Sequence, residues 1–575
     1  MWTNLTNEQE KIVNKSGKYV VEARAGSGKT LTLSKKLIKL IKNNKEMHTG
    51  IATLSFTNIA WKEIKNNLIS EGIEIKHPNF IGTLDKFINK FIFFRYYYLL
   101  EEFNQRPELV GNFGIPWMTK NNEYHYNQYF DCFSFDLNDK LIKTRNKNTF
   151  FKFDPENEKN KHYKNIKKMK NKLFQRGYVT QDDINYFSYK LIKKHSFISK
   201  NIAKRFPYFL VDEAQDTNEI KIKILKYIMS EKDIKEFAFI GDFNQAIYEW
   251  NGAKPELFED LSDEFEKIQL KDNWRSSQKI CDFTSNMINK KINSCNDEVK
   301  DFDFKPSIEK YDKKKANSDF YNRKIDEFLN ICKKHNIKIN KDNVAVLCRG
   351  QSLVNEIKNI NSDYKEKEDN IFINKLIKSK IYYDSKDLKE SYSNLKYIFI
   401  ALQLKDNKNF STFNKIEKEL DFNSTREECY KLVKILPSLD NKTVHEWVTE
   451  LKNILKESNF KYNEKLLKKL ENNNENNIKI QGLFNTPNSP RNYTLSTIHQ
   501  SKGKTFEAVL IFIKNRTQKK SYKNIIDEYN ESNKLSEELR IIYVGITRPK
   551  KILVLYVPKE DFNSWNKLFY TKNQH

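Results

Sequence analysis

The sequence predicts an α/β protein with two cores, each a parallel sheet flanked by helices and each interrupted by a mainly helical insertion. Short apolar runs of strand length alternate with segments of helical spacing near both ends of the chain. The stretches between them are polar and rich in Lys and Asn, with predominantly helical patterns. This order of elements favours two α/β units over an all-helical or all-strand protein.

The length of 575 residues corresponds to about three to five folding units. The predicted strands are the apolar runs 19–21, 51–56, 208–211, 237–240, 344–347, 493–498, 508–512 and 552–556. The predicted division assigns 1–87 and 181–271 to the first core, 88–180 to its helical insertion, 272–377 and 491–575 to the second core, and 378–490 to a reduced helical insertion.

The composition argues against several classes of protein. The hydrophobic fraction is only 38%, but 13% aromatic residues argue against a disordered chain. No run approaches the ~18 apolar residues that span a bilayer, and the first residues lack the layout of a signal peptide. The 6 cysteines lie far apart without a CxxC pair, which suits a reducing compartment. We therefore expect a cytoplasmic protein with no membrane partner.

The chain is strongly basic, with 102 Lys+Arg against 76 Asp+Glu and a formal net charge of +26. One interpretation is a polyanionic partner, above all nucleic acid. The other is the Lys, Asn and Ile bias of an AT-rich genome, which alone would produce much of this charge. The basic run 161–176 has the same two interpretations, a solvated helix face or a contact with duplex DNA. Charge alone leaves both open.

The first chemical motif is a Gly-rich turn between a predicted strand and a predicted helix. It consists of Ala25, Gly26, Ser27, Gly28, Lys29 and Thr30. Glycines let backbone N–H groups converge on phosphate oxygens, and the helix N-terminus adds a partial positive charge. Lys29 is predicted to reach the β- and γ-phosphates and the Thr30 hydroxyl to bind Mg²⁺. The turn is therefore predicted to be a P-loop.

The second motif is a group of carboxylates, Asp212, Glu213 and Asp216, directly after the apolar run 208–211. In a P-loop protein an acidic residue at a strand end holds Mg²⁺, which is the role predicted for Asp212. Glu213 is predicted to polarise the attacking water. Taken alone, this group is also compatible with a solvated start of a helix. The preceding strand and the upstream P-loop favour NTP hydrolysis.

With these motifs, the chain resembles superfamily 1 DNA helicases of the UvrD/Rep/PcrA family across nearly its whole length. The segments that carry the resemblance, in the family's order, are 5–9, 55–60, 82–87, 241–253, 273–276, 344–349, 496–503 and 543–548. An ordered series of this kind is far more specific than a single P-loop. The resemblance implies that both cores are RecA-like P-loop NTPase cores.

The resemblance also implies which residues meet the nucleotide. Gln9 would read the adenine edge and Trp274 would stack on the adenine. Gln245 would sense the γ-phosphate, Arg275 would contact it, and Arg548 would be an arginine finger supplied by the second core. Such a finger is worth ~10³–10⁵ in rate, and it acts only when the cleft closes.

The sequence departs from the family pattern at several positions. Leu31 stands where the family often has Arg. Thr505 replaces the glutamate that would meet the ribose hydroxyl, which puts sugar selectivity in doubt. Pro549 follows the arginine finger in place of the usual alanine.

Residues that contact single-stranded DNA are implied in the same way. They are Phe56, Thr57, Asn58, Thr83, Tyr248, Trp250 and His499. On their own, Tyr248 and Trp250 would more often be core aromatics, and His499 a structural histidine. Their positions within matching motifs favour stacking on bases, which is worth ~1–3 kcal/mol per base and tolerates any sequence.

We therefore predict an ATP- and Mg²⁺-dependent DNA helicase or translocase that moves 3′ to 5′ along single-stranded DNA, with single-stranded and tailed duplex DNA as partners. The alternative is a DNA-activated NTPase sensor that works with a partner nuclease, because the compact chain is similar to the helicase subunit of Gabija-type antiphage systems. Repair and antiphage defence both stay open, as does the oligomeric state. A third possibility, a pseudo-enzyme, is disfavoured because Lys29, Asp212, Glu213 and Arg548 are all intact.

Overall fold

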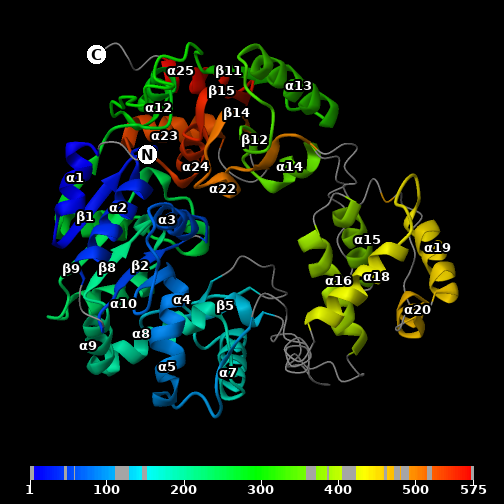
Figure 1. Ribbon diagram of the computed structural model, residues 1–575, viewed down its shortest axis with the longest axis horizontal. Helices are drawn as coiled ribbons and strands as arrows, with labels where there is room; N and C mark the ends of the chain where they lie inside the picture. Colours follow the sequence, from blue (N-terminus) through cyan, green and yellow to red (C-terminus); the bar gives the residue numbers. More distant parts are fainter. Residues whose placement is uncertain are drawn as a thin grey trace.

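The computed structural model describes residues 5–44, 48–56, 58–110, 129–144, 152–357, 371–384, 388–403, 422–458, 463–471, 480, 491–514 and 521–570. Two parallel sheets with helices packed around them form the two cores, as Figure 1 shows. The predicted α/β class is therefore confirmed. Within the described residues, no helix is long and apolar enough to cross a membrane.

The first sheet has the strand order β10-β1-β9-β8-β2-β3, and every neighbouring pair is parallel. Its strands are β1 (Gly17–Ala23), β2 (Ile51–Ser55), β3 (Phe80–Thr83), β8 (Tyr208–Val211), β9 (Glu236–Gly241) and β10 (Glu266–Leu270). Successive residues of a strand face opposite layers: Phe209 packs in one hydrophobic cluster and Leu210 in another. The central strands are buried on both faces, which explains their near-continuous apolar sequence.

Helices cover both faces of this sheet. They are α1 (Asn7–Asn14), α2 (Lys29–Asn43), α3 (Asn58–Ser70), α4 (Leu84–Ile88), α8 (Gln181–Lys194), α9 (Ser196–Arg205), α10 (Glu219–Met229) and α11 (Glu256–Glu264). The cluster on one face takes Leu37 from α2 and Leu68 from α3. The cluster on the other face takes Ile184 from α8 and Leu225 from α10. This three-layer packing fixes the strand ends on which the site is built.

The second sheet has the order β11-β15-β14-β12-β13, again parallel throughout. Its strands are β11 (Ser307–Tyr311), β12 (Val344–Cys348), β13 (Thr494–Thr497), β14 (Phe506–Phe512) and β15 (Pro549–Pro558). The flanking helices are α12 (Gln278–Ile288), α13 (Ser318–Lys334), α14 (Gln351–Ile357), α22 (Ile498–Ser501), α23 (Tyr522–Ser532), α24 (Glu537–Ile546) and α25 (Phe562–Tyr570).

The sequence did not predict three edge strands, β3, β10 and β11. Their residues are only partly buried, whereas every residue of β2, β9 and β12 is buried. An edge strand has one side without a neighbour, so its sequence needs fewer apolar residues and gives a weaker pattern.

The segment between α4 and α8 contains strands as well as helices. Helix α7 (Lys161–Gln175) lies beside the antiparallel pair β5 (Phe133–Phe135) and β6 (Leu141–Lys143) and the parallel pair β4 (Glu108–Leu109) and β7 (Tyr178–Val179). One face of α7 is buried and apolar. Its buried Lys170 pairs with the buried Asp183 of α8 at 2.7 Å, which ties α7 to the first core.

A second group of helices stands apart from both sheets at the right of Figure 1. It consists of α15 (Ile371–Asp384), α16 (Leu388–Gln403), α18 (Phe422–Ile435), α19 (Val444–Glu457) and α20 (Asn463–Glu471). These helices share their own hydrophobic cluster around the fully buried Trp447. The predicted start of this insertion at 378 falls inside α15, because Ile373 and Leu376 pack in the same cluster as the residues after 378.

Candidate active site

The carboxyl ends of the first sheet's strands carry the predicted nucleotide-binding residues. The P-loop follows β1, Asp212 and Glu213 follow β8, and Asp242 follows β9. Since β1, β9 and β8 are neighbours in a parallel sheet, these ends meet at one edge. Ligands bind at this edge in open α/β sheets. The topology therefore brings together Lys29 and Glu213, which are 184 positions apart in the chain.

Two glycines shape the P-loop. Gly26 and Gly28 have φ values of 77° and 76°, a left-handed conformation that other residues rarely adopt. A Cβ on Gly26 would lie 2.8 Å from the Asn273 side chain, and a Cβ on Gly28 would lie 2.6 Å from Gln9 Nε2. Neither position has room for a side chain. The loop delivers Lys29 and Thr30 to the first turn of α2.

The predicted adenine-binding residues lie against the P-loop. Gln9 Nε2 donates to the Ser27 carbonyl at 3.2 Å, and the backbone N–H of Trp274 donates to the Gly26 carbonyl at 2.7 Å. Gln9 is buried at the N-terminus of α1, whereas Trp274 is 40% exposed. The structure thus places both at the loop and leaves the indole open for a stacking partner.

The predicted catalytic lysine and the carboxylates form one charged cluster. Lys29 Nζ is hydrogen-bonded to Glu213 and lies 3.7 Å from Asp212 Oδ1. Burial opposes the lysine's charge, but Glu213 and Asp212 outweigh it, so the pKa of Lys29 is raised. Desolvation likewise opposes the charge of the half-buried Glu213, but Lys29 and then Lys502 stabilise that charge, so the pKa of Glu213 is lowered. At neutral pH, Glu213 is a carboxylate.

A Mg²⁺ ion fits the donors that remain at this cluster. Asp212 is 1% exposed, and its Oδ2 atom has no hydrogen-bond partner within the described residues. Thr30 lies in the first turn of α2, directly after the P-loop that follows β1. The part of the chain that the structure describes holds no group of three or more His, Cys, Asp or Glu able to bind a metal. Mg²⁺ sites built from one or two carboxylates plus substrate phosphates match such a sparse donor set.

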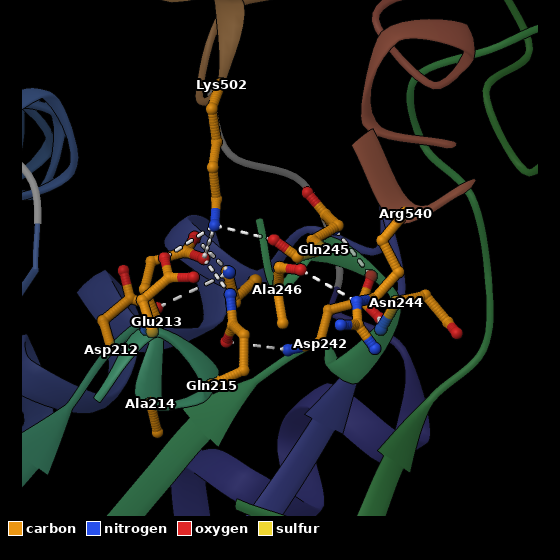
Figure 2. A network of polar contacts seen from close by, with 12 residues as sticks. Asp212, Glu213, Ala214, Gln215, Asp242, Asn244, Gln245, Ala246, Lys502 and Arg540 are labelled. Carbon is orange, nitrogen blue, oxygen red and sulfur yellow. Dashed lines mark hydrogen bonds and ion pairs between the residues drawn. The ribbon is translucent and has the colours of Figure 1, made fainter. Parts of the chain in front are cut away.

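Lys502 crosses from the second core into this cluster, as Figure 2 shows. Its Nζ donates to Asp216 Oδ2 at 2.6 Å and to the Gln245 carbonyl at 2.8 Å, and lies 3.7 Å from Glu213 Oε2. The lysine and Asp216 are both buried. The carboxylates of the first core are thus neutralised in part by the second core.

Gln245 lies between the two cores. Its Nε2 donates to Asp242 Oδ2 at 2.6 Å, and its Oε1 accepts from Arg548 Nη2 at 3.0 Å. Arg275 donates to the Thr547 carbonyl at 2.8 Å, next to Arg548. Burial and then the neighbouring Arg275 lower the pKa of Arg548. Two adjacent guanidinium groups at the junction are suited to an anionic ligand.

Three of the predicted strand-contact residues form an aromatic group across the two cores. The ring centroids of Tyr248 and Trp250 are 6.3 Å apart, and His499 of α22 lies 6.1 Å and 6.4 Å from them. Trp250 is 60% exposed, which a core aromatic would not be. Tyr248 is half-buried and has Lys502 Nζ 5.0 Å from its ring.

The other predicted strand contacts lie elsewhere on the same edge. Phe56 follows β2, and Thr83, paired in register with Ser55, ends β3. The Thr83 hydroxyl accepts from the Lys86 N–H and caps α4. Thr57 lies outside the described residues, as does the side chain of Asn58. Thr505 is half-buried in the loop between α22 and β14, beside Lys504, whose carbonyl accepts from Arg548 at 3.4 Å.

Three residues of the site, Lys502, Asp216 and Arg540, carry no role predicted from the sequence. Lys502 and Asp216 lie within motifs that the sequence displays, but their pairing depends on how the two cores meet. Arg540 lies in none of the matched segments. Its signal was a single arginine inside the apolar stretch of α24, since a charge in a buried helix needs a partner.

Comparison with known proteins agrees with this architecture. Residues 5–266 match the UvrD/REP helicase N-terminal domain, and residues 360–560 match the UvrD-like helicase C-terminal domain. The Gabija protein GajB of Bacillus cereus is 31% identical over 296 residues, covering 50% of this chain and 49% of that protein. A probable DNA helicase II homolog of Mycoplasma genitalium is 24% identical over 636 residues, covering 96% of this chain and 84% of the relative.

DNA helicase II of Haemophilus influenzae is 26% identical over 294 residues, covering 49% of this chain and 40% of that protein. The chain thus spans about half the length of several relatives that it matches, including GajB. The two matched domains lie in the order of the two sheets and contain the residues of the site except Trp274 and Arg275, which lie between the two matches. The chain belongs to the UvrD/Rep family of helicases.

Proposed function

We propose that the chain is an ATP-dependent DNA helicase or translocase that moves 3′ to 5′ along single-stranded DNA. The observation that carries this proposal is the network in which Lys502 of the second core meets Glu213, Asp216 and Gln245 of the first. Through this network, the charge at the predicted hydrolysis site depends on the position of the second sheet relative to the first. The exposed Trp250 lies on the same segment as Gln245.

Each residue of the cluster has a chemical role in this proposal. Lys29 and the P-loop N–H groups hold the β- and γ-phosphates, and Glu213 accepts a proton from the attacking water. Arg275 and Arg548 stabilise the charge that develops on the transferred phosphoryl group. A bound Mg²⁺, held by Thr30 and Asp212, would neutralise phosphate charge. Trp274 and Gln9 hold the adenine.

Hydrolysis then becomes movement because the two cores share the site. Arg548 and Lys502 belong to the second core, so the ligand's phosphate charge draws the cores together. After hydrolysis this attraction weakens and the cleft opens. The aromatic group of Tyr248, Trp250 and His499 lies at the same junction, so its distance from Phe56 and Thr83 of the first core changes with the cleft. Stacking on bases tolerates any sequence, which suits a translocase.

The second candidate function is a DNA-activated NTPase sensor that acts with a partner nuclease in antiphage defence. The observation that favours it is the 31% identity to the Gabija protein GajB. In this case the same site hydrolyses ATP without processive strand separation. Under either function the protein would act in the cytoplasm, on single-stranded or tailed duplex DNA, in DNA repair or antiphage defence.

The test is ATP turnover by the purified chain with and without single-stranded DNA, together with strand separation of duplexes that carry a 3′ or a 5′ tail. Turnover stimulated by DNA with unwinding of only the 3′-tailed duplex supports the translocase. Stimulated turnover without unwinding of either duplex favours the sensor. Equal ATP turnover with and without DNA contradicts both functions.

A further inference from the structure

The segment from Gln245 to Trp250 follows β9 of the first sheet, yet its contacts are mostly with the second core. Ile247 is fully buried in the hydrophobic cluster of the second sheet, and Tyr248 packs against the same cluster. Lys502 holds the Gln245 carbonyl at 2.8 Å. The segment that carries the predicted strand-contact aromatics therefore packs on the second core.

Arg540 of α24 makes two polar contacts with this segment, one to Ala246 and one to Glu249. Its Nε donates to the Ala246 carbonyl at 2.9 Å, its Nη1 donates to the Leu535 carbonyl at 3.0 Å, and its Nη2 forms an ion pair with Glu249. Its guanidinium also lies 5.3 Å from the centroid of the Phe243 ring. Arg540 is 3% exposed. A planar guanidinium whose three nitrogens all have partners holds those partners in one orientation.

A second contact from α24 lies directly beside this ion pair. Glu537 Oε1 accepts from the backbone N–H of Trp250 at 3.3 Å. The helix therefore binds Ala246 and Glu249, which lie on either side of Tyr248 in the sequence, and Trp250 itself. In Figure 2, Arg540 meets the Ala246 carbonyl at the right of the view, and Lys502 enters the network from the top.

The two ends of the segment stay attached to the first core. Gln245 Nε2 is bound to Asp242 at 2.6 Å, and the Lys254 N–H donates to the Thr217 carbonyl at 3.1 Å. Gly252, near the second end, has φ 83°, a conformation that favours glycine. Residues 245–254 therefore form a short strap whose ends lie on the first core and whose middle lies on the second. Such a strap must flex at its ends when the cores separate.

We propose that Arg540 is a positioning residue that clasps this strap to the second core through Ala246 and Glu249. The clasp makes Tyr248 and Trp250 move with α24 when the cleft opens or closes. Arg548, the predicted arginine finger, comes directly after Thr547, the C-cap of the same helix. One rigid helix thus links the predicted arginine finger to the strand-contact aromatics. This inference rests on the proposed function, because it assigns the coupling between its two ligands.

The test measures how a non-hydrolysable ATP analogue changes the affinity for fluorescent single-stranded DNA. Coupling between two ligands is typically about 5–150-fold. We expect the full chain to show a change in this range and both Glu249→Gln and Arg540→Gln to reduce it to about twofold or less. Affinity for DNA without the analogue should stay within about threefold. The double variant should be no worse than Arg540→Gln, since both changes break one contact.

Glu259→Gln, on the exposed part of α11, is the matched control and should leave the coupling unchanged. Glu249→Gln keeps the side-chain volume, so it tests the clasp even if Arg540→Gln fails to fold. Retained coupling in Glu249→Gln overturns the clasp. An equal loss of DNA affinity with and without the analogue also overturns it, because that result indicates a structural role only. If the unmodified chain binds DNA but shows neither coupling nor DNA-stimulated turnover, the proposed function itself fails.

Discussion

Lys502 Nζ lies 2.6 Å from Asp216 Oδ2, and both residues are buried where the two sheets meet. The lysine follows β13 and α22 of the second core, whereas the aspartate follows β8 of the first. Glu213, three residues before Asp216, bonds to Lys29 of the P-loop. A change in the distance between the sheets therefore changes the charge around the predicted catalytic carboxylate. This ion pair therefore couples the opening of the cleft to the electrostatics of the predicted hydrolysis site.

Replacement of the P-loop lysine should abolish hydrolysis but not DNA binding. Lys29→Ala removes the cation that meets the phosphates, so we expect ATP turnover to fall by about 100-fold or more. DNA affinity measured by fluorescence anisotropy should change little, since Lys29 bonds to the carboxylate cluster, whereas the predicted stacking on bases is made by aromatic residues of other segments. Lys35→Ala on the same helix, where the lysine pairs with Glu71 at 2.9 Å, is the control. Substantial turnover in Lys29→Ala would refute the assignment of the P-loop.

Removal of the exposed indole should uncouple DNA from hydrolysis. Trp250→Ala deletes a stacking platform worth about 1–3 kcal/mol, so the DNA concentration for half-maximal stimulation should rise about 5- to 150-fold. Basal turnover without DNA should change less. Tyr98, which is 65% exposed, provides the control substitution Tyr98→Ala. Unchanged stimulation in Trp250→Ala would remove this residue from the strand contact.

The buried carboxyl of Asp242 should make stability depend on pH. Burial raises its pKa to about 6, above its ordinary value of 3.8. Between these values the folded state binds more protons than the unfolded state, so this group's contribution to stability falls as pH rises, by roughly 3 kcal/mol in all. The full loss of stability is reached only above about pH 6, where the buried carboxyl is ionised.

Asp242→Asn removes this titration. We therefore expect the difference in thermal midpoint between the variant and the unmodified chain to shift in favour of the variant as pH rises from about 4 to 6, and then to level off. Scanning fluorimetry across this range measures it. A difference that does not vary with pH would show that Asp242 keeps an ordinary pKa.

Affinity for DNA should fall steeply with salt. A protein that neutralises several phosphates releases counterions, so we expect a loss of about 100-fold or more between 50 and 200 mM salt. The exposed face of α7 allows the basic run 161–176 to be tested, because Lys164, Lys167 and Lys168 line a groove of about 520 Å³ there. Replacing all three with Gln should reduce the slope of log K for duplex DNA by about 2–3 if each contacts a phosphate. An unchanged slope would assign them to a solvated face.

Sugar selectivity should be weak. Thr505 is predicted to stand where the family's glutamate meets the ribose hydroxyl, so we expect kcat/KM values for ATP and dATP to agree within about threefold. Thr505→Glu should raise the preference for ATP by restoring a hydrogen-bond acceptor, with kcat for ATP nearly unchanged. A strong preference for ATP in the unmodified chain would mean that another residue reads the ribose.

The sequence alone determined the class of fold and the local chemistry. Each central strand is an apolar run because it is buried on both faces, and the P-loop is visible because only glycine tolerates φ near 76° between Asn273 and Gln9. Motif order then identified the family before any coordinates. These features depend on short stretches of chain, where sequence and conformation are tightly linked.

Only the tertiary structure decided which distant residues meet. The edge strands β3, β10 and β11 were missed because partial burial demands fewer apolar residues. The pairing of Lys502 with Asp216 and of Arg540 with Glu249 depends on how the two cores approach each other. A buried charge reveals that a partner must exist, but the identity of that partner depends on packing between segments hundreds of residues apart.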